Sequence, residues 1–207
     1  MYDLQSDQAE PYLQWFDQVH IPEKLARPGY TWAAHYKVHA GDKSGRYIAL
    51  FGGTDSRVFY DPSPAQIKPK QPPETREMMS YRSNSRMWIM AEEWSTNRSS
   101  ETSPVSAEIH APTICLSVLD VAGADENLGA WLCQDYLVNG AQGRYTRKYL
   151  ASTGDARHVV IEEFDGIEVT ADLIVNRAAG DWAADVADSN QYPVGDQWVA
   201  QRVWPGL

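Results

Sequence analysis

The chain has 207 residues and a formal net charge of −10, and 43% of its residues are hydrophobic against 22% that are charged. This composition is typical of a soluble globular protein, and the negative charge argues against a nucleic-acid or anionic-membrane partner. No apolar run approaches the roughly 18 residues of a membrane helix, and the N-terminus lacks the basic and apolar regions of a secretory signal.

The first half of the sequence predicts a mixed unit of helices and strands. Apolar side chains at helical spacing indicate a helix, aromatic-rich stretches indicate strands, and five closely spaced prolines indicate a loop. In chain order the predicted elements are a stunted strand in residues 1–5, a helix within 7–26 that ends around His20 or Pro22, strands at 30–38 and 46–52 with a turn from Gly41 to Gly45, a loop over 61–75, a short helix around 74–82 and a strand at 86–94.

The second half predicts the same order of elements. They are a strand at 113–121, a helix at 124–138, strands at 144–151 and 157–164, a helix within 170–188 and a strand at 197–204. The stretch between the halves is rich in Ser, Thr and Pro, as linkers are. We therefore divide the chain into a first unit at 1–95, a linker at 96–111 and a second unit at 112–207.

Eight tryptophans suggest that the two units arose by duplication. Four matches follow one another in sequence order, and their offset drifts in one direction, as small deletions between matched elements would produce. The matches are Trp15 with Trp131, residues 29–37 with 143–149, residues 46–50 with 157–161, and the pair Trp88 and Trp94 with the pair Trp198 and Trp204.

The element order is β-α-β-β-α-β, twice, which is the ferredoxin-like unit of an α+β protein. Each unit has a four-stranded sheet with both helices on one face, so its other face is bare. We expect the two bare faces to pack sheet to sheet, with the large tryptophan rings filling the interface.

The segment WFDQVHIPEKLARPGYTWAAHYKV, followed by RYIALFGG, resembles the dimeric α+β barrel superfamily and in particular its EthD-like members. These share a W-[YF]-[DN]-x-x-H-[IL]-P segment, a Pro-Gly-aromatic turn and an R-Y-x-A-L-[YF] strand. The match covers residues 13–52 well and 75–95 loosely. It implies that the two repeats form a pseudo-dimeric barrel within one chain. The superfamily includes polyketide cyclases, isomerases, cofactor-free monooxygenases and haem enzymes, so the resemblance specifies a fold and not a reaction.

His20 is the first candidate for chemistry, because a histidine can accept and return a proton near neutral pH. Asp17 precedes it by three residues, close enough on a helix to orient its ring. The alternative is that His20 only caps the end of the helix. The Trp15–Trp131 match aligns His20 with Tyr136, so the second repeat lacks the histidine. We therefore expect one active site, in the first repeat, and a structural second repeat.

The strand at 30–38 supplies further candidates, because alternate residues share a face. Tyr30, Trp32 and Tyr36 lie in one row that could stack on an aromatic ligand, with the two tyrosines as helper donors. The alternative for this row is ordinary core packing on the sheet. His35 lies in the other row, which would face the interface between the repeats if the aromatic row lines the pocket; the alignment does not determine which row faces which side. The predicted catalytic residues are thus His20, Asp17, Tyr30 and Tyr36, and the predicted substrate-binding residues are Trp15, Trp32, His35 and Tyr136.

No metal-ligand spacing is present among the histidines and cysteines, and no phosphate-binding glycine motif or serine-hydrolase motif occurs. We therefore predict no metal and no cofactor, and the two cysteines favour a reducing, cytoplasmic compartment. The predicted function is a cofactor-independent isomerase, cyclase, dehydratase or lyase acting on a hydrophobic, aromatic or polyketide-like small molecule. The alternatives are a non-catalytic ligand-binding protein, a cofactor-free monooxygenase and a haem enzyme, and a further homodimer stays open.

Overall fold

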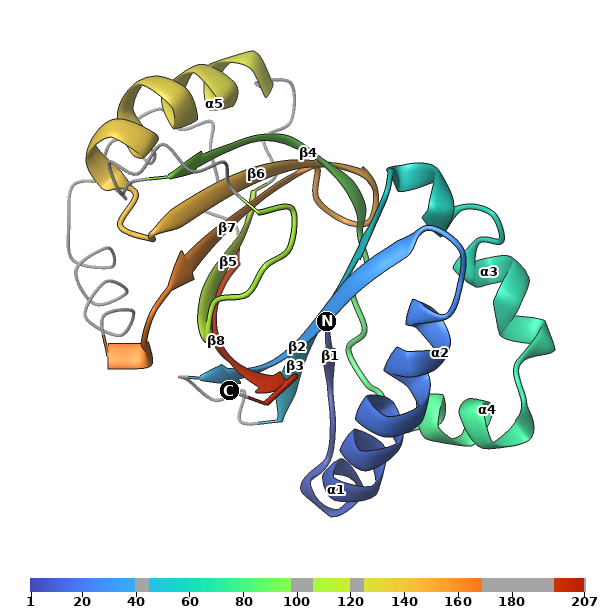
Figure 1. The fold of residues 1–207 in the computed structure, drawn as a ribbon. Helices are drawn as coiled ribbons and strands as arrows, with labels where there is room; N and C mark the ends of the chain where they lie inside the picture. The colour runs from blue at the N-terminus through green and yellow to red at the C-terminus, as the bar shows by residue number, and fades with distance from the viewer. Residues whose placement is uncertain (40–44, 98–105, 120–124, 169–195, 207) are drawn as a thin grey trace.

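A computed structural model describes residues 1–39, 45–97, 106–119, 125–168 and 196–206 (Figure 1). Its strands are β1 (Tyr2–Asp3), β2 (Tyr30–His39), β3 (Arg46–Gly53), β4 (Ile89–Asn97), β5 (Thr113–Leu119), β6 (Tyr145–Thr153), β7 (His158–Phe164) and β8 (Gln197–Trp204). Its α-helices are α1 (Ser6–Trp15), α2 (Ile21–Leu25), α3 (Pro64–Ile67), α4 (Pro73–Ser80) and α5 (Asp125–Trp131).

The eight strands form one antiparallel sheet in the order β1-β3-β2-β8-β5-β7-β6-β4. Strands of the first half join strands of the second half at β2–β8 and at β4–β6. The two sheets that we predicted as face-to-face layers are therefore joined edge to edge. This pairing satisfies backbone groups that two separate four-stranded sheets would leave open along their edges.

The sheet curves, with α1 and α2 against β2 and β3 at one end and α5 at the other (Figure 1). On β3, Ile48 and Leu50 belong to the main core on the face away from the helices, whereas Tyr47 belongs to a second core under α1. This alternation follows from the two-residue period of a strand. The main core also takes side chains from β2, β5, β7 and β8, so the largest apolar cluster lies on the inner face of the curved sheet.

β1 links the two ends of the strand order. It pairs with β3 at Tyr2–Tyr47 and Asp3–Arg46, and on its other side the backbone of Asp3 pairs with that of Ser83, just before β4. Beyond Tyr47, no strand of the described chain lies on this side of β3. The strands thus form a ring. β1 joins the two ends of the strand order on one side, and the ring is open between the rest of β3 and the start of β4.

Most predicted elements are confirmed with small shifts in their bounds. The strands at 30–38, 46–52, 157–164 and 197–204, the short helix at 74–82 and the stunted first strand are all present. The last strand of the first half begins three residues later than predicted, and the predicted loop at 61–75 contains α3. Most of the turn predicted from Gly41 to Gly45, and the helix predicted within 170–188, lie outside the described residues.

The prediction that the first helix ends near His20 or Pro22 is wrong. A π-helical turn, Phe16–His20, follows α1 directly, and α2 continues the same helix to Leu25. Pro22 lies directly after the π-helical turn, and the helix continues through it without ending. His20 is therefore in the interior of a continuous helix, which excludes the alternative that it caps a helix end.

Candidate active site

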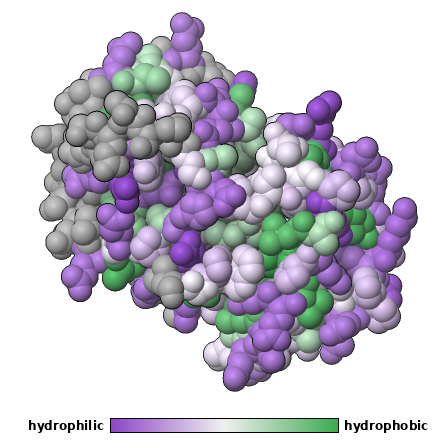
Figure 2. Space-filling model, in the orientation of Figure 1, coloured by the Kyte–Doolittle hydropathy of each residue, from purple (hydrophilic) through white to green (hydrophobic). Residues whose placement is uncertain are grey.

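A cavity of about 1060 Å³ lies where the ring of strands is open, and residues 48–53 of β3 and 89–92 of β4 both line it. The helical side of the first half contributes His20, Lys24 and Arg82. In Figure 2, hydrophobic surface gathers near the centre of the face that Figure 1 presents, flanked by hydrophilic residues. A volume of this size is sufficient for a drug-sized ligand.

Aromatic and aliphatic side chains form most of the cavity wall. They are Tyr30, Trp32, Ile48, Leu50, Phe51, Phe59, Ile67, Met79, Trp88, Met90, Tyr149, Val159 and Ile161, among others. The indole of Trp32 lies directly over Gly52, where an added Cβ would come within 1.8 Å of the indole Nε1. Gly52 therefore sets the position of one aromatic wall, because only glycine leaves room for this cross-strand approach.

The π-helical turn places His20 at the cavity. Its side chain is 6% exposed, and its ring lies 4.9 Å from the ring of Trp15 and 5.1 Å from that of Phe16. Among the described residues its buried Nδ1 has no hydrogen-bond partner, and the residue lines the cavity. A π-turn inside an α-helix frequently marks a functional site.

The surroundings keep His20 neutral. Burial lowers its pKa to about 3, and the positive charges of Lys24 and Arg82 act in the same direction. An imidazolium donates from both nitrogens, and Nδ1 has no acceptor within reach. At neutral pH the residue is therefore a proton acceptor or a neutral hydrogen-bonding group, and not a proton donor.

Lys24 and Arg82 form the cationic end of the cavity. Burial lowers the pKa of the Lys24 ammonium to about 8, with Arg27 and Arg82 adding to the effect. The Arg82 guanidinium lies 4.1 Å above the centre of the Tyr2 ring and donates from Nε to the hydroxyl of Tyr12. Aromatic partners thus hold Arg82 in place without neutralising its charge.

Asp17 contacts His35 and not His20. Its Oδ1 accepts a hydrogen bond from Nδ1 of His35 at 3.2 Å, and the other ring nitrogen of His35 lies 2.8 Å from the Tyr2 hydroxyl. His35 is fully buried under α1, on the helix face of β2, so the predicted place at the interface between the repeats is wrong. Because a carboxylate only accepts, Nδ1 of His35 carries a proton. Burial lowers the pKa of His35 and so favours the neutral ring, in which Nε2 accepts from the Tyr2 hydroxyl.

The predicted aromatic row on β2 is interrupted by a register shift between Tyr30 and Trp32. Tyr30 and Trp32 both line the cavity, but the ring of Tyr30 contacts Phe59 at 5.1 Å whereas Trp32 packs on the main core. Tyr36 is buried in that core and donates a hydrogen bond to the carbonyl of Ala111. The structure therefore brings His20, Tyr30 and Trp32 to one cavity and leaves Tyr36 outside its lining.

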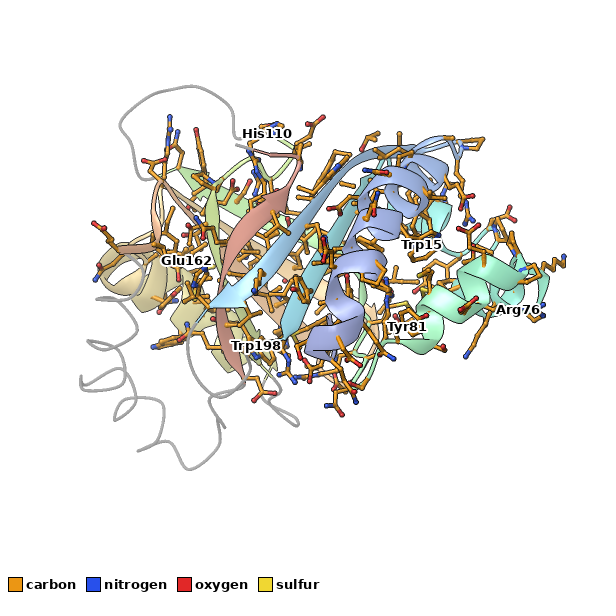
Figure 3. The ribbon with its side chains drawn as sticks, turned by 90° about the horizontal axis from the view of Figure 1, so that it is seen from below. Trp15, Arg76, Tyr81, His110, Glu162 and Trp198 are labelled. Carbon is orange, nitrogen blue, oxygen red and sulfur yellow. The ribbon has the colours of Figure 1, made fainter. Side chains whose placement is uncertain are left out.

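Two further candidates lie away from the cavity lining. Trp15, the last residue of α1, belongs to the second core, and the centre of its ring lies 4.9 Å from that of His20. Tyr136 donates a hydrogen bond of 2.6 Å to Oε2 of Glu162 on β7. Glu162 lies at the opposite end of the molecule from Trp15, as Figure 3 shows. Tyr136 is thus part of a buried polar cluster in the second half.

The sequence interpretation missed Lys24, Arg82 and Trp88 as cavity residues. Lys24 follows His20 by four residues, so the helical period could have placed it on the same side as His20. Arg82 and Trp88 come from distant elements, and no local spacing signals their approach. Among the described residues, no group of three or more potential metal ligands is present. None of the described helices has the length and apolar character needed to cross a membrane.

No protein-family model and no curated protein matches the sequence. Two solved structures resemble the fold. An anthrone oxidase-like protein aligns with a TM-score of 0.64 at 12% identity, over 97% of this chain and 87% of its own. A protein of Fusobacterium nucleatum, described as a "putative monooxygenase", aligns with a TM-score of 0.56 at 10% identity, over 98% of this chain and 89% of its own. At such identities the similarity shows the fold, a mixed α+β architecture of the α+β barrel type.

Proposed function

We propose that this protein is a cofactor-independent enzyme in which His20 accepts a proton from a hydrophobic, aromatic small molecule. The observation that carries the proposal is a neutral histidine in the wall of a cavity of about 1060 Å³. The largely apolar wall suits an aromatic substrate and excludes much of the water that would compete for the proton.

The proposed step breaks an acidic C–H or O–H bond of the substrate. The proton moves to Nε2 of His20, and the electron pair stays on the substrate as an enolate or phenolate. The positive charges of Lys24 and Arg82 oppose formation of the imidazolium but stabilise the substrate anion. The imidazolium then returns the proton to another atom of the substrate, which completes an isomerisation or sets up a cyclisation or elimination.

Among the other candidates, Tyr30 keeps its proposed role as a hydrogen-bond donor, because it lines the same cavity. Trp32 keeps its proposed role as a stacking surface. Asp17 takes no part in orienting His20, since its carboxylate is bound to His35. Tyr36 is engaged with Ala111 and is not included in the step.

The direct test is hydrogen–deuterium exchange into the substrate, followed by NMR in D₂O with a panel of aromatic ketones and phenols. Exchange at a carbon atom of the substrate reports C–H abstraction whatever reaction follows, whereas O–H protons exchange with D₂O without a catalyst and are not scored. We expect the wild-type protein to catalyse exchange and His20→Gln to lose it while still binding the same compound. The control is His39→Asn, an exposed histidine on β2. Unchanged exchange in His20→Gln overturns the proposed base, and binding without exchange in the wild type favours a non-catalytic binding protein.

A second candidate function is a cofactor-free oxidation, which the descriptions of the two neighbours favour. It begins with the same proton abstraction and then requires dioxygen to oxidise the substrate anion. Anthrone belongs in the panel for this reason. Oxygen uptake that depends on His20 identifies the oxidation, whereas exchange without oxygen uptake identifies the acid–base reaction.

We also propose that the chain is a tandem duplication that forms a pseudo-dimeric barrel, with units 1–95 and 112–207. Three observations support it. The strand order β8-β5-β7-β6 is the ferredoxin-like order. The pairs β2–β8 and β4–β6 are equivalent, because each joins the second strand of one unit to the last strand of the other. Trp204 pairs with His35 as Trp94 pairs with Lys148. Both matched tryptophans, Trp15 and Trp131, end an α-helix that continues as a π-helical turn. An EthD-like relationship and a cytoplasmic location stay predictions from the sequence.

A further inference from the structure

The cavity is positively charged inside a chain whose net charge is −10. Its lining holds four cationic side chains, Lys24, Lys68, Arg82 and Arg86, and two carboxylates. Both carboxylates have arginine partners, since Asp55 pairs with Arg57 and Glu92 pairs with Arg147. The lining therefore has more positive charge than its own acidic groups offset.

The cations differ in what surrounds them. Arg86 forms ion pairs with Asp155 and Asp196, and Lys68 is exposed to solvent. In the part of the chain that the structure describes, neither Lys24 nor Arg82 forms an ion pair. Both are partly buried and both act on His20 through their charge. Within the described ranges they form a cationic end to which no carboxylate is ion-paired, beside an aromatic wall.

A protein gains nothing in stability by burying two like charges near each other without a carboxylate. A bound anion removes this cost, and it gains strength from the low dielectric of the cavity. The ring of Tyr2 lies against one face of the Arg82 guanidinium, and the hydroxyl of Tyr12 takes the Nε–H. Within the described part of the chain its other N–H groups donate no hydrogen bond, so they are available for an anion.

We propose that the substrate is an aromatic acid, bound with its rings against Trp32 and Phe51 and its carboxylate between Lys24 and Arg82. This inference rests on the proposed function, because it names the class of substrate that the same cavity binds. The anion belongs to the substrate before any chemistry occurs, so the selectivity shows in binding alone.

The test compares 2-naphthoate with the uncharged isostere 2-naphthamide, using the full chain and its tryptophan fluorescence, since Trp32 and Trp88 line the cavity. We expect the acid to bind at least about tenfold more tightly than the amide. Lys24→Met and Arg82→Met should each weaken binding of the acid by about tenfold and change binding of the amide by less than about twofold. Because the pair is partly buried, most of the preference should persist in high salt.

The matched control is Lys37→Met, an exposed lysine on β2 outside the lining. It should leave both affinities unchanged. Equal binding of acid and amide overturns the inference, and so does an equal loss for both ligands in Lys24→Met and Arg82→Met. Far-ultraviolet circular dichroism shows whether each variant is folded, and the conservative Arg82→Lys should recover part of the acid binding. His20→Gln should keep the preference for the acid. If His20 turns out not to be the proton acceptor, the comparison of acid and amide binding is therefore still valid.

Discussion

The neutral state of His20 should make the protein less stable in acid by a predictable amount. His20 has a pKa of about 3 in the folded chain against 6.5 in the unfolded chain. Between these values the unfolded state binds the proton and the folded state does not, so the free energy of unfolding falls as the pH falls. At pH 5 the unfolded imidazole is protonated, 1.5 pH units below its own pKa, while the folded one is still neutral. The loss from pH 8 to pH 5 is therefore about 2 kcal/mol from this residue.

The assay is urea unfolding of the wild type and His20→Gln at pH 8 and pH 5. At pH 8 the histidine is neutral in both states, so the difference between the two proteins reports lost packing against Trp15 and Phe16. At pH 5 this difference should be smaller by about 2 kcal/mol, because the glutamine variant does not take up the proton on unfolding. Of the cations that act on His20, Arg27 and Arg82 keep their charge at both pH values. Lys24, whose pKa burial lowers to about 8, is partly deprotonated at pH 8 in the wild type and in the variant alike.

Ile21→Val provides the matched control, because Ile21 is fully buried beside His20 and does not titrate. Its cost should be about 1 kcal/mol and equal at the two pH values. If the stability difference between wild type and His20→Gln changes by less than about 0.5 kcal/mol between pH 8 and pH 5, His20 takes up a proton in the folded chain. The assignment of His20 as a neutral proton acceptor is then refuted.

Three other substitutions test the geometry around the cavity. Gly52→Ala should displace the Trp32 indole, which lowers the free energy of unfolding by about 1–3 kcal/mol and weakens 2-naphthamide binding. Tryptophan fluorescence measures both effects. An unchanged affinity would mean that Trp32 is not a wall of the site. Asp17→Ala should lower the free energy of unfolding in urea by about 1–3 kcal/mol, because Nδ1–H of the buried His35 is left without an acceptor. Asp17→Asn can still accept the hydrogen bond and should cost less. Equal costs for the two variants would contradict the hydrogen bond. Tyr136→Phe should lower stability by about 1–2 kcal/mol and leave 2-naphthoate affinity unaltered, and a weaker affinity would place it in the binding site.

The sequence predicted the elements well because their signals are local. Aromatic and β-branched stretches with turn residues on either side marked β2, β3, β7 and β8 to within one or two residues. The prediction of where the first helix ends was also wrong for a local reason. A proline such as Pro22 indicates the end of a helix, and only the π-turn before it made the difference. No periodicity of 3.6 residues describes a turn of that kind.

The site was harder to predict because its residues meet only in the folded chain. His20, Tyr30 and Trp32 come from one continuous stretch, and all three reach the cavity. Arg82 arrives from beyond α4, and its charge changes what His20 can do. The pairing of Asp17 was misassigned because the nearest partner along a helix competed with His35, which the sheet brings under α1.

His20 and Tyr136 lie at the same position of a π-turn in the two halves, but the hydrogen-bond partners and charges around the two rings differ. In the second half Tyr136 is satisfied, because its hydroxyl is bound to a buried carboxylate that also accepts backbone N–H groups from Gln142 and Gly143. In the first half Nδ1 of His20 has no hydrogen-bond partner among the described residues, and the charges of Lys24, Arg27 and Arg82 oppose protonation of the ring. An arrangement that lowers stability persists where it serves binding or catalysis, whereas a satisfied one needs no such reason. This contrast, and not the presence of a histidine alone, assigns the proposed activity to the first half.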